Sequence, residues 1–144
     1  MRAAIMVALS ASLLWSAGAQ ATQRDGHAGA RWFIGLWEGV DPGDGSLTQR
    51  AITCERNECE VLGSDSFFRL CDGTQGILEG AGSIDDGVLA VPDFTLTCAN
   101  GAAVSVDTTF TPDFRNRTLV EQTADPNIAA ITFHKLSLSP RGRR

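Results

Sequence analysis

Four cysteines are the residues whose number and spacing point most directly to chemistry in this chain of 144 residues. Cys54, Cys59, Cys71 and Cys98 are separated by four, eleven and twenty-six residues, whereas a four-cysteine zinc site has two close pairs such as C-x2-C. The even number therefore favours two disulfides formed in an oxidising compartment. Glu55–Glu58 has the composition of a hairpin tip, so we expect bridges between Cys54 and Cys59 and between Cys71 and Cys98. A pairing of Cys59 with Cys71 is the alternative.

Groups that could act as catalysts or hold a metal ion are few. His27 lies in a stretch rich in Gly and Ala, and His134 stands between Phe133 and Lys135 in a strand-like run. The chain has no G-x-S-x-G, H-E-x-x-H or Gly-rich phosphate motif. The loop 41–46 is rich in oxygen ligands, but it lacks the spacing of a calcium loop and favours a plain turn. We therefore predict a non-enzymatic protein with no metal ion and no cofactor.

Composition places the chain among globular proteins and narrows the classes of partner. Hydrophobic residues make up 43% of the chain and charged residues 20%, which is the balance of a folded domain rather than of a disordered one. The 17 acidic residues outnumber the 12 Lys and Arg, so the formal net charge is −5. This net charge argues against nucleic acid or an anionic membrane surface as the partner.

The first residues have the features of a secretory signal peptide. Arg2 supplies a positive start, and the apolar run Ala3–Trp15 is too short to span a bilayer, which needs about 20 residues. Two cleavage motifs follow, and the second predicts cleavage after Ala21. No later apolar run reaches membrane-spanning length, so we expect a secreted or periplasmic protein. The predicted organisation is a signal peptide over 1–21, a flexible segment over 22–31, a β-barrel domain over 32–137 and a basic tail over 138–144.

Strand-like runs alternate with turn signals along the rest of the chain. Asp85–Gly87 and Asn100–Gly101 are typical of hairpin turns, because glycine tolerates the positive φ that these turns need. No helical pattern is long enough for a crossover helix, although a short helical turn fits Asp25–Ala30. We therefore expect an all-β fold in which eight or nine antiparallel strands form an up-and-down meander closed into a small barrel, with a two-sheet sandwich as the rival. The expected strands cover 32–40, 47–54, 59–63, 67–71, 77–84, 88–98, 103–111, 118–122 and 128–136.

The triplet Gly35-Leu36-Trp37, in the first expected strand, resembles the G-x-W signature of lipocalins and other calycins. The resemblance implies a lipocalin-like barrel in which Trp37 closes one end and a basic residue late in the chain packs on it. Arg115, Arg117 and Lys135 are the candidates for that residue. The lipocalin T-D-x-x-Y element is missing. The chain is also similar to short secreted bacterial proteins of no known activity, which share the opening W-E-G-V-D-x-x-D-G found here at Trp37–Gly45.

The expected barrel favours a binding protein. A barrel of this strand number encloses at most one small ligand, so the first hypothesis is a small apolar or amphipathic ligand at its open end. Gly80 and Gly82 could leave space for it, or could instead mark a close backbone approach or a bend. Resemblance to small exported calycin barrels that inhibit metalloproteases implies the alternative, a protein–protein role in which Thr22–Ala30 inserts into the partner. A structural protein without a ligand is the third hypothesis.

Turn order predicts where a ligand would enter, because alternate turns of a meander lie at the same end. The rim that we expect to form the mouth comprises the tips Asp41–Gly45, Ser64–Ser66, Asp85–Gly87 and Pro112–Asn116. All four cysteines are expected to border the opposite rim, so the first rim has no covalent restraint. Binding sites are commonly built from loops on a rigid scaffold. Phe67, Phe68 and Phe114 are therefore the expected ligand-binding residues.

Export predicts two properties of the recovered protein. Cleavage after Ala21 leaves a chain that begins at Thr22, and oxidation of both cysteine pairs leaves no free thiol. Intact-mass measurement before and after alkylation without reduction checks both properties. A recovered chain that keeps residues 1–21, or that takes up two or more alkyl groups, would show the prediction to be wrong.

Overall fold

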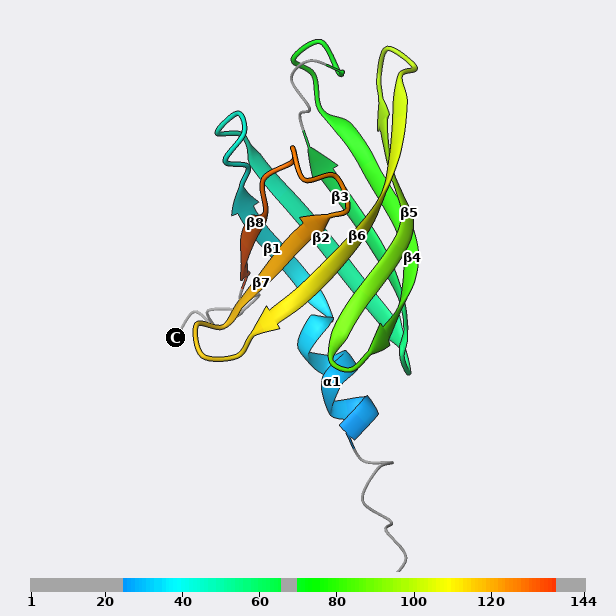
Figure 1. Ribbon diagram of the computed structural model, residues 1–144, viewed down its shortest axis with the longest axis vertical. Helices are drawn as coiled ribbons and strands as arrows, with labels where there is room; N and C mark the ends of the chain where they lie inside the picture. The colour runs from blue at the N-terminus through cyan, green and yellow to red at the C-terminus, as the bar shows by residue number, and fades with distance from the viewer. Residues whose placement is uncertain (1–24, 66–69, 137–144) are drawn as a thin grey trace, which may run out of the picture.

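The computed structural model describes residues 25–65 and 70–136 and shows a closed barrel of eight antiparallel strands (Figure 1). Each strand pairs with the next strand in the sequence, and β8 pairs with β1 to close the barrel. The elements are α1 (Asp25–Phe33), β1 (Gly35–Val40), β2 (Leu47–Glu55), β3 (Glu58–Asp65), β4 (Gly76–Asp85), β5 (Val88–Cys98), β6 (Ala103–Asp113), β7 (Thr118–Thr123) and β8 (Ile131–Lys135). The expected all-β, up-and-down barrel is therefore confirmed, and the chain does not form the rival sandwich.

One short helix precedes the barrel and lies at one end of it (Figure 1). α1 includes the helical turn expected at Asp25–Ala30 and continues to Phe33, so it overlaps the segment 22–31 that we expected to be flexible. Ala30 and Phe33 are buried, which anchors the helix to this end of the barrel. Gly35 then adopts a φ of 139°, a conformation open to glycine, and the chain turns from the helix into β1.

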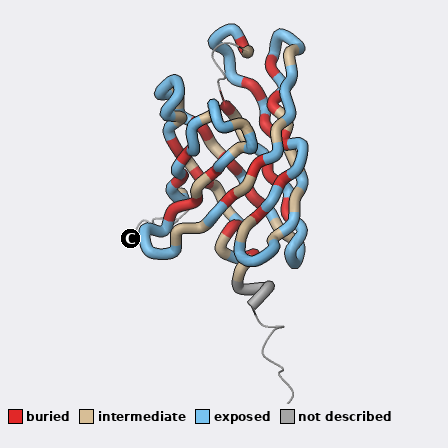
Figure 2. Tube along the Cα trace, viewed as in Figure 1, coloured by how far each residue is buried: buried red, intermediate tan, exposed pale blue. Residues whose placement is uncertain are grey.

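Strand residues alternate between the interior and the solvent (Figure 2), as a half-buried strand requires. In β2, for example, Thr48, Arg50 and Ile52 are buried, whereas Leu47 and Ala51 are exposed. The core therefore lies inside the barrel. Its largest fully buried side chains are Trp37, Arg50, Phe33, Phe94, Phe110, Phe133, Ile52, Leu89, Leu119, Val61, Val91 and Thr48.

Most of the strand expected over 67–71 lies outside the described residues. β3 pairs directly with β4 in antiparallel register. Leu70 and Cys71 belong to the turn before β4, and Phe67 and Phe68 lie outside the described residues. The run has the apolar composition of a strand, but Cys71 is tied into this connection by its disulfide to Cys98. The closed sheet has eight strands, within the eight or nine that we expected.

The direct pairing of β3 with β4 determines which turns share an end of the barrel. Turns 56–57, 86–87 and 114–117 lie at the end that carries α1, which we call the helix end. Turns 41–46, 70–75, 99–102 and 124–130 lie at the opposite end, which we call the distal end. The expected rim was therefore wrong, because Asp85–Gly87 and Pro112–Asn116 lie at the opposite end from Asp41–Gly45.

Two disulfides form with the preferred pairing, Cys54–Cys59 and Cys71–Cys98. The first joins two residues that face each other across β2 and β3 near the helix end. The second joins the β3–β4 connection to the end of β5 at the distal end. Each end thus has one bridge, and the expectation that all four cysteines border one rim was wrong. Both bridges constrain the unfolded chain and are compatible with an extracellular or periplasmic location.

Trp37 offers a direct test of how this end of the barrel is held. Its side chain is 1% exposed, and its indole Nε1 donates a hydrogen bond of 2.7 Å to the carbonyl oxygen of Phe33. Replacing Trp37 with Ala leaves a large cavity, so we expect the free energy of unfolding to fall by about 3–5 kcal/mol. Urea unfolding measures the loss, with Val104→Ala on the exposed face of β6 as a control that should change little. A loss below about 1 kcal/mol would mean that Trp37 does not close the barrel.

Candidate functional site

Large side chains occupy the interior of the barrel in its described part. An eight-stranded barrel has an interior just wide enough for side chains to fill. Phe94 and Phe110 meet edge to face with ring centroids 5.9 Å apart. A methyl group added at Gly80 would lie 2.6 Å from Val91 Cγ1 and 2.9 Å from Phe94 Cδ2. Gly82 likewise faces the backbone of β5, so both glycines permit a close approach and neither leaves space for a ligand.

A charged side chain lies within this apolar interior. Arg50, on β2, is 1% exposed, and Glu121 on β7 binds its guanidinium with both carboxylate oxygens. The Nε–Oε2 distance is 2.7 Å and the Nη2–Oε1 distance is 2.9 Å. Nη2 also lies 3.3 Å from Oδ2 of Asp65 at the end of β3, and Nη1 donates to Thr48 Oγ1 at 2.7 Å. Four inward side chains from three strands therefore form one buried polar cluster, which we call the Arg50 cluster.

Two aromatic rings and a glycine shape the space around the guanidinium. The ring centroids of Phe94 and Phe133 lie 5.7 Å and 5.1 Å from Arg50 Cζ, within the range of a cation–π contact. A methyl group at Gly63 would lie 2.8 Å from Arg50 Cδ and 2.6 Å from the carbonyl oxygen of Gln49. Glycine is therefore needed at position 63 for Arg50 to lie inside the barrel.

The Arg50 cluster holds one positive and two negative side chains. Burial lowers the pKa of Arg50, but the carboxylates of Glu121 and Asp65 outweigh burial and raise this pKa above its usual value. The guanidinium therefore stays charged and cannot exchange a proton in acid–base chemistry. Asp65 Oδ1 is buried and has no hydrogen-bond partner among the described residues. These features fit a structural cluster better than a catalytic one.

At the helix end, the structure selects the basic residue that packs on Trp37. Lys135 Nζ lies 5.0 Å from the centroid of the Trp37 ring and donates to the carbonyl oxygen of Trp32 at 2.9 Å. Burial lowers the pKa of Lys135. Arg115 and Arg117, the other two candidates, lie on the exposed β6–β7 turn. Trp37 is thus buried beneath α1, with Lys135 on its ring.

Phe114 is the one expected ligand-binding residue that the structure describes. Its side chain is 64% exposed at the tip of the β6–β7 turn, and its ring meets Trp32 edge to face at 5.3 Å. Phe114 therefore lies at the helix end, away from the loop 41–46. Phe67 and Phe68 lie outside the described residues.

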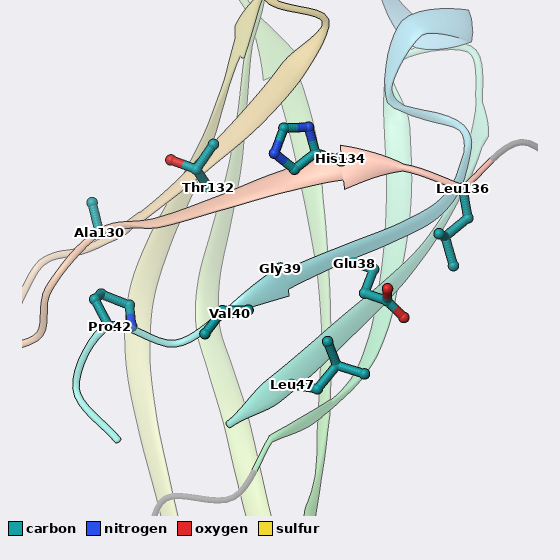
Figure 3. Close-up of a pocket in the computed structure, with 9 residues that line it drawn as sticks. All are labelled: Glu38, Gly39, Val40, Pro42, Leu47, Ala130, Thr132, His134 and Leu136. Atoms are coloured by element: carbon teal, nitrogen blue, oxygen red, sulfur yellow. The ribbon is translucent and has the colours of Figure 1, made fainter. Parts of the chain in front are cut away.

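An apolar groove of about 420 Å³ lies on the outer face of the barrel, over β1, β2 and β8 (Figure 3). Val40 and Leu47 face each other across the β1–β2 pair and are 57% and 53% exposed. Glu38 and His134 face each other across the β1–β8 pair and supply polar groups. The groove is lined by Glu38, Gly39, Val40, Pro42, Leu47, Ala130, Thr132, His134 and Leu136.

Sequence reasoning missed this groove, although a signal for it was present. Outward positions of a strand with one solvated face are usually polar, so Val40 and Leu47 on either side of the turn 41–46 are exceptions to that pattern. The carboxylate of Glu38 is also fixed in place, because Gln49 Nε2 donates to its Oε2 at 2.8 Å. The groove therefore combines an apolar wall with an oriented negative charge.

The oxygen-rich loop 41–46 forms a turn whose side chains bind its own backbone. Asp41 Oδ1 accepts a hydrogen bond of 2.6 Å from Gly43 N, and Asp44 Oδ1 accepts one of 2.8 Å from Ser46 N. Burial raises the pKa of Asp41, and the negative charges of Asp65 and Asp44 add to this effect. Among residues 25–65 and 70–136, no three His, Cys, Asp or Glu side chains are placed to hold a metal ion.

Comparisons with known proteins leave the barrel without a family. No family model, no curated protein and no solved structure matches the chain. The part of the chain that the structure describes contains no helix with the length and apolar character needed to cross a membrane.

The Arg50 cluster predicts a large penalty for removing its cation. Arg50→Met keeps a long side chain but leaves Glu121 and Asp65 buried without their partner, so we expect a loss of about 3–5 kcal/mol in the free energy of unfolding. Adding Glu121→Gln and Asp65→Asn removes the uncompensated charges and should recover much of that loss. Urea unfolding of each variant measures both effects. Arg56→Met, in the exposed β2–β3 turn, is the control. If it lowers the free energy of unfolding as much as Arg50→Met does, the buried ion pairs do not stabilise the barrel.

Proposed function

We propose that the chain is an exported, non-enzymatic binding protein that holds a small amphipathic ligand in its outer groove. The observation that carries this proposal is the position of the apolar groove. It lies outside the barrel, whereas large side chains and the Arg50 cluster occupy the interior. The apolar part of the ligand covers Val40 and Leu47, and its polar head lies near Glu38.

The charge of Glu38 favours a ligand with a cationic head. Its carboxylate is half-buried and is oriented by Gln49, so its position is fixed before a ligand arrives. Hydrogen bonds between an ionised donor and a carboxylate are about twice as strong as neutral ones. An amphipathic cation can therefore place its apolar chain along Val40 and Leu47 and its positive head at Glu38 (Figure 3).

A catalytic interpretation of the same groove has less support. Thr132, His134 and Glu38 all line it, and these residue types can form a nucleophile, a base and an acid. Such a relay needs hydrogen bonds between neighbouring members. Within the part of the chain that the structure describes, no hydrogen bond joins these three side chains. A binding role therefore fits the groove better than a hydrolytic one.

The protease-inhibitor alternative also has less support. It requires the segment Thr22–Ala30 to insert into a partner. Of that segment, Asp25–Ala30 belongs to helix α1, and Ala30 is packed against the barrel. Secretion or a periplasmic location remains part of our proposal, supported by the signal-like first residues and by two disulfides.

The groove predicts which amphiphiles bind and which substitutions weaken binding. Isothermal titration calorimetry compares dodecyltrimethylammonium with dodecyl sulfate, which has the same apolar chain and the opposite charge. We expect the cation to bind more tightly, and Glu38→Gln to reduce that preference. Leu47→Gln removes part of the apolar wall and should weaken binding by about tenfold.

A matched control distinguishes the groove from general surface hydrophobicity. Leu62 on β3 is 54% exposed, compared with 53% for Leu47, and does not line the groove. Leu62→Gln should therefore leave the affinity unchanged. Equal losses for the two variants, or tighter binding of the anion, would show that the groove is not the binding site.

A further inference from the structure

The described basic residues gather at one end of the barrel. Among the described residues, every Lys and Arg except buried Arg50 lies at the helix end; these are Arg31, Arg56, Arg115, Arg117 and Lys135. The described turns of the distal end carry Asp41, Asp44, Asp72 and Asp125 and no basic residue, while Arg69 lies outside the described ranges. The helix end also carries acidic residues, so only the β6–β7 turn together with Lys135 has an excess of positive charge; the acidic residues are Glu55, Glu58, Asp85, Asp86 and Asp113.

One part of the helix end combines exposed aromatic surface with positive charge. We call it the aromatic–basic patch, and it comprises Trp32, Phe114, Arg115, Arg117 and Lys135. The Trp32 and Phe114 rings are in contact at 5.3 Å, and Lys135 Nζ donates to the Trp32 carbonyl oxygen, so these three residues are contiguous. Arg115 and Arg117 are exposed on the same turn as Phe114.

The turn that carries Phe114 is held by its own acidic residue. Asp113 accepts hydrogen bonds from Asn116 Nδ2 at 2.7 Å and from the backbone N–H groups of Arg115 and Asn116 at 3.0 Å and 3.1 Å. These bonds, chiefly those from Asn116, hold the pKa of Asp113 below its usual value. The carboxylate is thus used within the turn. Phe114 is left 64% exposed at the tip, with an arginine directly after it.

Both ends of the chain join the described barrel at this same end. α1 begins at Asp25, and the apolar run Ala3–Trp15 precedes it in the sequence. The described part ends at Leu136, directly after Lys135, and the eight residues that follow contain three arginines. Both segments lie outside the described residues, and the aromatic–basic patch includes neither of them.

We propose that the aromatic–basic patch docks the protein on an anionic lipid surface, with the helix end facing the bilayer. Aromatic rings favour the boundary between lipid headgroups and acyl chains, and arginines are attracted to anionic headgroups. Phe114 is on a protruding turn rather than in a concave site, which suits insertion into a soft interface. The alternative partner, an acidic protein, would need a concave site that surrounds the tip of this turn in order to cover the Phe114 ring. The proposal is independent of the outer groove, because the two sites share no residue.

Vesicle flotation with the exported protein tests the proposal. The probes are vesicles of phosphatidylglycerol with phosphatidylethanolamine, and vesicles of phosphatidylcholine alone, each at low and high salt. We expect binding to the anionic vesicles only, with weakening at high salt because the attraction is screened. All variants are compared with the same N-terminus, confirmed by mass, so the contribution of the N-terminal segment cancels.

Two variants of the patch and two matched controls decide the outcome. Replacing Arg115 and Arg117 with Gln should weaken binding by about fivefold for each arginine lost. Phe114→Ser should also weaken it, whereas Ile77→Ser, an equally exposed apolar residue on β4, should not. Arg56 has a φ of 59° and Arg117 one of 58°, both in hairpin turns. Arg56 lies at the same end but outside the patch and beside Glu55, so Arg56→Gln should weaken binding less than the loss of either patch arginine.

Three results would overturn the proposal. The first is no binding to anionic vesicles by the parent protein. The second is an equal loss of binding for the patch variants and for the controls Arg56→Gln and Ile77→Ser. The third is binding to poly-glutamate, lost in the patch variants, without binding to vesicles, which would assign the patch to an acidic protein partner instead. Near-ultraviolet circular dichroism of each variant checks that the fold is intact. If Phe114→Ser or the double arginine variant loses the fold, Phe114→Leu or the single arginine substitutions replace it.

Discussion

The guanidinium of Arg50 is the group around which the barrel is organised. Placing an ion inside a protein costs several kcal/mol, and only close carboxylates and hydrogen bonds offset that cost. Here the partners come from distant parts of the chain, since Glu121 is 71 residues away from Arg50. Rings on β5 and β8 complete the enclosure. Strands β2, β3, β5, β7 and β8 must all meet correctly before this charge is satisfied.

This requirement specifies the register of the strands. A shift of β2 by one residue would move Arg50 to the outer face and bring Gln49 or Ala51 inside, because strand side chains alternate. The inward glycines fit the same arrangement. Gly63 makes room for Arg50, and Gly39 allows β8 to approach, since a methyl group there would lie 2.7 Å from the Thr132 carbonyl oxygen. We interpret the Arg50 cluster as selecting one closed arrangement among several that the apolar residues alone would permit.

Local signals in the sequence were sufficient for the fold class and for most turns. Hairpin signals such as Asp85–Gly87 and Asn100–Gly101 mark connections that the structure contains. The apolar run Phe67–Cys71 has the composition of a strand, but β3 pairs directly with β4, so no strand lies between those two in the sheet. Counting this run as a strand assigned every later turn to the opposite end of the barrel. The interior position of Arg50 could not be predicted from the local sequence pattern, because a charged residue in an alternating strand is normally assigned to the solvent side. Its partner Glu121 lies on β7, far away in the sequence. The outer groove depends on β8 meeting β1, which only closure of the barrel brings about.

The pairing of β8 with β1 has a consequence for how this chain can recognise anything else. Every described strand has a neighbour on each side, so the barrel presents no open edge to which a foreign strand could add. For the same reason, copies of the barrel cannot associate by pairing strands edge to edge. Contact with other molecules must therefore be made by side chains that project from a backbone already satisfied within itself. Such side chains can be substituted one at a time without loss of the barrel. The outer surface can therefore diversify during evolution while the fold is kept.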